Sequence, residues 1–253
     1  MADDAAFTPT RRTLLQTGAA VGGGLFLSWG LDAQGAVTAK AATLNAYVSI
    51  APSGAITIIS KNPECGQGVM TMLPMVIAEE LEADWSKVSI KEAMLDVDKF
   101  GFQSAGGSNS ARQNYDSLRR VGAAGKQMLI EAAATTWKVP ASECTAAMSA
   151  VTHGPTGRKL SYGKLASKAA HIPAPDVAKV ALKDPQDFKI VGQSARGCDS
   201  PKVIKGEPLF GIDTRLPGML YAVFVKCPVH GGTLKSAKLD AVLASPGVKK
   251  AFV

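Results

Sequence analysis

The stretch Glu64-Cys-Gly-Gln-Gly-Val-Met-Thr-Met-Leu-Pro-Met-Val-Ile-Ala-Glu-Glu-Leu81 decides the fold, because a glycine-rich turn runs directly into an apolar segment. After the turn, apolar residues recur at helical spacing, which predicts a helix over residues 69–81. Its far end carries Glu79, Glu80 and Glu82. Acidic groups near a helix C-terminus oppose the helix dipole, so we expect that end to be exposed.

Working outward, a strand–turn–strand pattern lies before this segment, centred on Pro52-Ser53-Gly54. Later stretches predict four more elements: a strand over residues 85–93, a helix over 115–137, a hairpin over 151–160 and a short helix over 162–170 capped by Ser161. The long helix is rich in alanine and glycine, so we expect another element to approach it closely.

The pattern changes in the last third of the chain. Prolines recur between residues 172 and 208 with little periodicity, which predicts a long connection over a surface and a domain boundary near residue 200. Beyond it we expect a buried strand over residues 220–226 and the start of a helix over 236–243. Residues 249–253 resemble the opening of a further strand, and a strand with no following partner suggests a truncated sequence.

The first forty residues resemble a twin-arginine export signal. Arg11 and Arg12 precede a weakly apolar, glycine-rich stretch over residues 17–31, and small residues follow it. The stretch is too short and too rich in glycine for a membrane span. We therefore expect a periplasmic protein, with the signal either cleaved or kept as an inner-membrane anchor. An N-terminal helix with two chance arginines is the alternative.

Composition excludes several classes of protein. The net charge of +7 is spread along the chain without a basic block or a nucleic-acid-binding motif, so we expect no nucleic-acid partner. The four cysteines are widely spaced and form no C-x-x-C pair, which disfavours a zinc ribbon or an iron–sulfur cluster in this chain. No hydrolase motif is present. Because the twin-arginine route exports folded proteins, the signal favours a cofactor enzyme.

Two loops, each placed before a helix, carry the candidate binding residues: Gly66, Gln67 and Gly68 in the first, and Gly106, Gly107, Ser108 and Ser110 in the second. Glycines let the backbone approach a ligand, and free N–H groups at a helix start suit phosphate. The alternative for the first loop is an ordinary tight turn, and the alternative for the second is a flexible loop without a ligand. The first loop matches neither a dinucleotide-binding fingerprint nor a Walker loop. Together, the two loops predict a site for a ligand with two phosphates.

Isolated histidines and cysteines are weaker candidates. We expect His153 and His171 on the surface, whereas His230 lies in a loop before two glycines and is a candidate neighbour of a site. Cys65 belongs to the first loop, and its isolated placement leads us to expect a small buried residue, with a metal-binding or redox role as the alternative.

Longer ordered motifs connect these features to a known family. They include Glu64-x-Gly66-Gln67-Gly68-Val-x-Thr71, Ala78-Glu79-Glu80-Leu81-x-x-Asp84-Trp85, Gly106-Gly107-Ser108-x-Ser110-x-Arg112 and Phe210-Gly211-Ile212-Asp213. From about residue 45 onward the chain resembles the molybdopterin-binding large (beta) subunit of the xanthine dehydrogenase/aldehyde oxidase family, in the isoquinoline 1-oxidoreductase beta-subunit branch. Gly125-Lys126 and His230 depart from the residues that are usual in this branch.

The resemblance implies an α+β fold. It places a mixed-sheet molybdopterin-binding domain at residues 43–170 behind a signal segment at 1–42. A connecting segment at 171–205 then leads into the start of a truncated α/β hammerhead domain at 206–253.

The resemblance also implies a function. Family members hydroxylate an aldehyde or N-heterocycle with oxygen from water, using molybdenum bound to molybdopterin, in bacteria commonly the cytosine dinucleotide form. Both glycine loops would contact this cofactor. Electrons would leave through a small subunit with two [2Fe–2S] clusters, and then through a cytochrome c. The base glutamate would lie beyond residue 253, so we assign no catalytic or metal-binding residue and expect this part to be inactive alone. A noncatalytic exported ligand-binding or interaction domain is the alternative.

Overall fold

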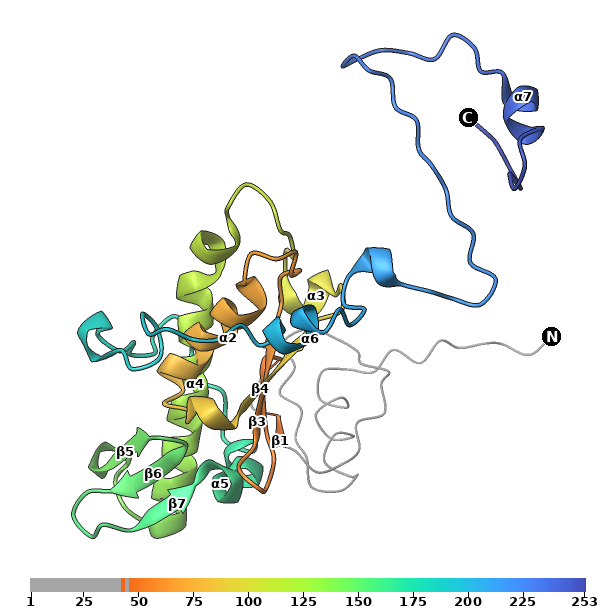
Figure 1. The fold of residues 1–253 in the computed structure, drawn as a ribbon. Coiled ribbons are helices and arrows are strands. Elements are labelled where there is room, and N and C mark those ends of the chain that lie inside the picture. The colour runs from red at the N-terminus through yellow and green to blue at the C-terminus, as the bar shows by residue number, and fades with distance from the viewer. Residues whose placement is uncertain (1–41, 44–45) are drawn as a thin grey trace, which may run out of the picture. The chain divides into compact units, whose positions relative to one another are not determined.

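The computed structural model describes residues 42–43 and 46–253 (Figure 1). The predicted export signal therefore lies outside the described residues, apart from its last position. The described residues form two compact units, one up to residue 209 and the other over residues 210–253. No helix within the described ranges is long and apolar enough to cross a membrane.

A mixed four-stranded sheet forms the base of the first unit. Its strands are β1 (Ala42–Thr43), β2 (Val48–Ile50), β3 (Ile56–Ser60) and β4 (Val88–Glu92), in that spatial order. The β1–β2 and β2–β3 pairs are antiparallel, whereas β3 and β4 are parallel, with Ile58 opposite Ile90. The expected strand–turn–strand is confirmed. The strand predicted over residues 85–93 begins only at Val88, because residues 85–87 form a 3₁₀ turn, η1, capped by Asp84.

Helix α2 (Val69–Glu80) forms where the decisive stretch predicts a helix, and it connects β3 to its parallel neighbour β4. It lies between the sheet and the long helix α4 (Ser110–Trp137) (Figure 1). The two helices approach closely where α4 carries Gly122, since a Cβ at this position would lie 2.3 Å from the backbone oxygen of Ile77. Helix α4 begins five residues before the predicted start at residue 115, so Ser110 belongs to the helix and not to the loop.

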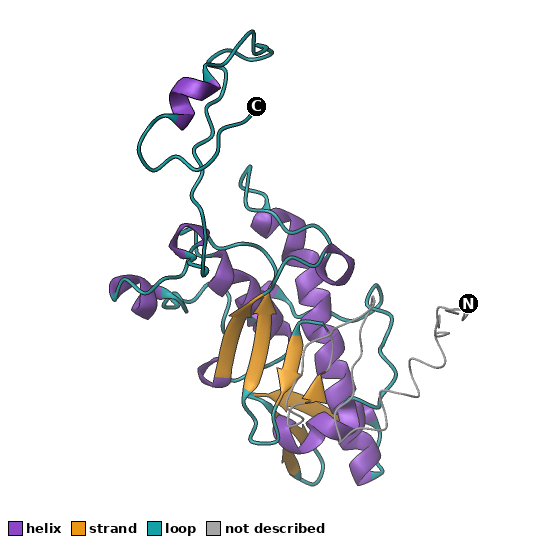
Figure 2. Cartoon of the chain, turned by 90° about the vertical axis from the view of Figure 1, so that its right-hand side faces the viewer, coloured by secondary structure: helices purple, strands orange, loops and turns teal. Residues whose placement is uncertain are grey.

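A second, three-stranded antiparallel sheet packs against the later part of α4, and Figure 2 shows both sheets in orange. It comprises β5 (Cys144–Ala147), β6 (Ala150–His153) and β7 (Lys159–Ser161), and helix α5 (Tyr162–Ala169) follows it. The predicted hairpin is thus present, whereas β5 was not predicted. Ser161 occupies the N-cap of α5 but makes no side-chain capping hydrogen bond.

The expectation that the acidic end of α2 is exposed is wrong. Glu79 and Glu80 are 1% and 0% exposed. The connecting segment folds over this end of the helix and supplies the partners that make burial possible. Lys183 Nζ lies 2.6 Å from Glu79 Oε1, and Arg119 of α4 lies 2.7 Å from Glu80 Oε1.

Backbone N–H groups of the same segment complete the cluster: those of residues 189, 190 and 191 donate to Glu79, and that of residue 183 donates to Glu80. The segment is otherwise mostly coil, with η3 (Pro185–Asp187) and α6 (Ser200–Ile204).

The second unit, residues 210–253, departs from prediction. It contains η4 (Gly211–Asp213) and α7 (Leu239–Leu243), and none of its residues is assigned to a strand. The buried strand expected over residues 220–226 is an exposed coil in which Val223 is 91% exposed, and residues 249–253 are also coil. Apolar character alone does not form a strand, since a strand needs a neighbour for its backbone hydrogen bonds.

Candidate functional site

The two predicted loops meet at one edge of the first sheet. Because β3 and β4 are parallel, they end at the same edge, and the backbone N–H of Ala93 donates to the oxygen of Ser60 there. Loop 1 (residues 61–68) leaves β3 and enters α2. Loop 2 (residues 101–109) follows β4 through the short helix α3 (Val97–Phe100) and enters α4. Both helices therefore start where the two loops lie.

Asn62 joins the loops directly. It is 2% exposed, and its Nδ2 donates to the backbone oxygen of Ser104 at 2.7 Å and to Ser110 Oγ at 3.3 Å. Asn114 of α4 in turn donates to Asn62 Oδ1. Gln103 adds a second link, since its Nε2 donates to the backbone oxygen of Lys61. Neither Asn62 nor Gln103 is among the residues predicted from the sequence. A polar residue just after an apolar strand was the available signal for Asn62.

A carboxylate of loop 1 accepts hydrogen bonds from backbone N–H groups at and before the start of α2. Glu64 accepts hydrogen bonds from the backbone N–H groups of Gly66, Gly68 and Met70 at 2.7, 3.0 and 2.8 Å. Burial raises the pKa of Glu64, but the hydrogen bonds from these backbone N–H groups lower it by more. The pKa of Glu64 therefore lies below the ordinary value of 4.5. The N–H groups that we expected to hold a phosphate are therefore already bonded to an anion of this chain.

The outer side of loop 1 stays open. Gly66 and Gly68 adopt φ values of 99° and 82°, and a Cβ at either position would meet nothing within 4 Å. Gln67 braces the turn, since its Nε2 donates to the oxygen of Pro63 and its Oε1 accepts from the N–H of Cys65. The loop thus presents backbone, free of side chains at its two glycines, to a ligand approaching from outside.

Loop 2 is held from within and is also open outside. Ser110 Oγ donates to the oxygen of Ser104 while accepting from Asn62, so this hydroxyl orders the loop. Gly107 and Ser108 adopt left-handed φ values of 59° and 53°. Gly106 has no positive φ, and the nearest atom to a Cβ there is 4.0 Å away.

The weaker candidates fall elsewhere, and two expectations about them are wrong. His153 is only 3% exposed, because its Nε2 lies 2.7 Å from Glu143 Oε2 and its Nδ1 lies 2.7 Å from Thr156 Oγ1. Cys65 is exposed, not buried. His171 is exposed as expected, and His230 is exposed within the second unit. No group of three or more metal-ligating side chains occurs among the described residues.

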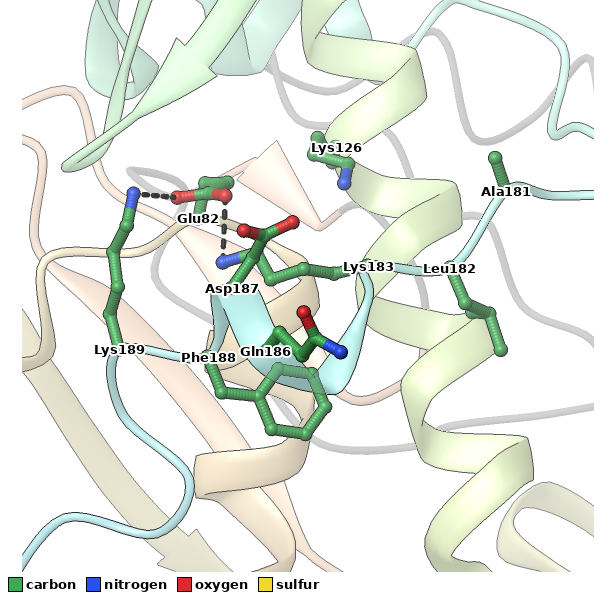
Figure 3. A pocket seen from close by; sticks show the side chains of 9 residues that line it. All are labelled: Glu82, Lys126, Ala181, Leu182, Lys183, Gln186, Asp187, Phe188 and Lys189. Carbon is green, nitrogen blue, oxygen red and sulfur yellow. Dashed lines mark ion pairs between the residues drawn. The ribbon is translucent and has the colours of Figure 1, made fainter.

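A hollow of about 580 Å³ lies at the other end of α2 (Figure 3). Glu82 lines it and pairs with Lys183 at 2.7 Å and with Lys189 at 3.8 Å. Lys126 of α4 points into it. Since Glu82, Lys183 and Lys189 are paired with one another, and since the hollow lies away from both loops, we place the candidate site at the loops.

Comparisons with known proteins identify the family of this chain. A family model described as the molybdopterin cofactor-binding domain matches residues 9–203. The chain is 36% identical over 179 residues to a membrane-bound aldehyde dehydrogenase [pyrroloquinoline-quinone] of Gluconacetobacter polyoxogenes, covering 69% of this chain and 23% of that protein. It is 28% identical to isoquinoline 1-oxidoreductase subunit beta of Brevundimonas diminuta, covering 87% of this chain and 33% of that protein.

Among solved structures, quinoline 2-oxidoreductase of Pseudomonas putida 86 aligns with a TM-score of 0.41 and 21% identity, over 56% of this chain and 19% of that one. The chain belongs to the molybdopterin cofactor-binding family of molybdenum hydroxylases and aldehyde oxidoreductases. It spans between about a quarter and a third of the length of the two curated relatives described above. The expected family and the expected α+β fold with a mixed sheet are confirmed.

Proposed function

We propose that this chain is the N-terminal part of an exported molybdenum hydroxylase large subunit. The observation that carries the proposal is that two open, glycine-rich loops meet at the edge of the first sheet where α2 and α4 begin. The chain that carries these loops belongs to a molybdopterin-binding family. The complete enzyme would oxidise an aldehyde or an N-heterocycle and pass electrons to a separate subunit with [2Fe–2S] clusters.

The loops fit a large planar cofactor with phosphate groups. Gly66, Gly68 and Gly106 leave room that a side chain would fill. We propose that they contact the cofactor through the backbone, together with Gln67, Gly107 and Ser108. Ser110 serves the site indirectly, because its hydroxyl is bonded to Asn62 and Ser104.

The chain's own residues position and shape the site. When bound, the molybdenum cofactor supplies the redox chemistry that adds oxygen from water to a substrate carbon. Asn62 and Gln103 fix the spacing of the two loops, and Glu64 holds the first turn of α2 rigid. We assign none of these residues a role in bond breaking.

We also propose the form of the cofactor, the redox partners and the location of the complex. The cofactor is the cytosine dinucleotide form of molybdopterin, the redox partners are the small [2Fe–2S] subunit and a cytochrome c, and the complex is periplasmic. The paired Arg11 and Arg12 support the last of these. The wide spacing of the cysteines is consistent with clusters on a separate subunit.

Gly106→Val in the complete subunit tests the site. Because Gly106 has no positive φ and faces open space, valine adds bulk without backbone strain. We expect molybdenum and pterin contents to fall at least about tenfold, as for the loss of roughly 1.4 kcal/mol or more of binding free energy. Metal analysis and the fluorescence of the oxidised pterin measure both.

Gly154→Val is the matched control. Gly154 is an exposed turn glycine without positive φ in the β6–β7 hairpin, and a Cβ there makes only ordinary contact at 3.5 Å. This variant should keep its cofactor. Full occupancy in a folded Gly106→Val variant would remove loop 2 from the site.

A further inference from the structure

The site as described lacks a free positive charge for a ligand with phosphates. Glu64 brings a negative charge to the start of α2. Two nearby cations are engaged locally: Arg112 donates to Asn109 Oδ1 at 2.9 Å, and Lys99 lies over the ring of Phe100 at 5.1 Å. A phosphate at the loops needs a cation that is not already committed.

Lys61 has the properties of such a cation. It follows β3 directly, is 8% exposed, and lies at the junction of the loops, where its backbone oxygen accepts from Gln103. Its Nζ is 3.9 Å from the position that a Cβ on Gly101 of loop 2 would take. Within the described part of the chain, no acceptor or carboxylate is bonded to this ammonium.

The ammonium is buried but still accessible. No side-chain nitrogen or oxygen of the described residues is both fully enclosed and without a hydrogen-bond partner, so Lys61 Nζ keeps contact with solvent. Burial lowers the pKa of Lys61 below its ordinary value of 10.5. An unpaired ammonium in a buried position destabilises the fold, and an incoming anion would offset that cost.

We propose that the ammonium of Lys61 binds a phosphate group of the ligand held between loops 1 and 2. The identity of that ligand as the molybdopterin cofactor rests on the proposed function. The recognition itself is a charge-assisted hydrogen bond between an ammonium and a phosphate oxygen, made at the point where both loops begin.

Lys61→Met tests this in the complete subunit within its complex. Methionine keeps most of the buried aliphatic stem and removes the charge, so the cofactor-free protein should melt at the same or a higher temperature. Pterin and molybdenum contents should fall by about tenfold to a hundredfold, the loss expected for one charge-assisted hydrogen bond. Lys61→Arg keeps the charge and should retain most of the cofactor. The control is Lys91→Met, which changes an exposed lysine on β4 and should alter neither property.

A purely structural role for Lys61 gives the opposite pattern. In that case Lys61→Met would lower the melting temperature of the cofactor-free protein and leave the pterin content of the folded fraction unchanged. Either result in a folded variant overturns the proposal.

A second measurement separates this proposal from the proposed function. If the wild-type complex carries no pterin, the proposed function fails, and the anion site is then tested with inorganic pyrophosphate. Saturating pyrophosphate should slow acylation of Lys61 by a lysine reagent severalfold, measured by mass spectrometry, and leave Lys91 unaffected. Equal acylation of Lys61 with and without pyrophosphate overturns the anion site.

Discussion

At the scale of single residues, the site depends on side chains that never need to touch a ligand. Asn62 donates to the backbone of loop 2 and to the first residue of α4, and Glu64 accepts from three N–H groups around the start of α2. Both residues are committed to the backbone, so they set the shape of the loops. The glycines then define the open surface.

Asn62→Asp tests this role. The carboxylate would face the backbone oxygen of Ser104 without a proton to donate, and a buried unsatisfied pair of acceptors costs about 1–3 kcal/mol or more. We expect faster hydrogen exchange over residues 104–110. Asn109→Asp is the control, since its carboxylate can still accept from Arg112 and should leave exchange in loop 2 nearly unchanged. Equal exchange in both variants would show that Asn62 does not order loop 2.

At the scale of elements, the end of α2 is the feature that local sequence describes least well. Glu79 and Glu80 are buried because Lys183 and the N–H groups of residues 189–191 cover them. Burial raises the pKa of Glu79, but the hydrogen bond from Lys183 and those from the backbone lower it more, to below 4.5. Burial lowers the pKa of Lys183, whereas Glu79 and Glu82 raise it above 10.5 overall.

This cluster predicts acid sensitivity with a defined sign. The pKa of Glu79 is lowered in the folded state, so its contribution to the free energy of unfolding is present above pH 4.5. That contribution is lost as the pH falls through the lowered pKa. The contribution of Lys183 is complete below pH 10.5 and is lost only at higher pH, as the pH rises through the raised pKa.

We therefore expect Glu79→Gln to lower the free energy of unfolding by about 3 kcal/mol at neutral pH, the loss typical of breaking a buried ion pair. The acid-induced decline should also become shallower in this variant. Urea denaturation between about pH 3 and pH 7 measures both effects. Asp176→Asn, which alters an exposed pair with Lys179, should change stability by less than about 1 kcal/mol. If the free energy of unfolding of Glu79→Gln fell between pH 7 and pH 3 as steeply as that of the wild type, Glu79 would not be the source of the acid sensitivity.

The sequence predicts the elements that depend on neighbouring residues and misses those that depend on distant ones. The turn before α2, the spacing along α4 and the β6–β7 hairpin are all encoded locally, and all are present. The burial of Glu79 depends on residues more than a hundred positions away. The strand expected over residues 220–226 requires a partner that its own apolar pattern does not supply. The loop glycines were found from their motif, but their bracing by Asn62 required the fold.

At the scale of the whole molecule, the first unit joins a βαβ crossover to a second sheet through one long helix. Helix α4 contacts α2 beside the candidate site and contacts β5 and β6 further along its length. The loops therefore start from a packed core, while the aligned part of this chain covers only 23% and 33% of the two curated relatives.

Export is a property of the whole molecule, and Arg11 and Arg12 test it. We expect the double variant Arg11→Lys, Arg12→Lys to accumulate in the cytoplasm, because twin-arginine transport depends on the paired arginines. Fractionation of cells expressing the complete complex measures this, and a variant altered at Lys40 alone serves as the control. Wild-type amounts of the double variant in the periplasm would exclude this export route.

We propose that this chain holds a molybdenum cofactor at loops 1 and 2. The most direct test of this proposal is the molybdenum and pterin content of the complete complex, purified from its own host and compared with the Gly106→Val variant. We expect equimolar molybdenum and pterin in the wild-type complex, with release of a cytosine nucleotide on hydrolysis, and loss of molybdenum and pterin in the variant. A folded wild-type complex without molybdenum or pterin would contradict it.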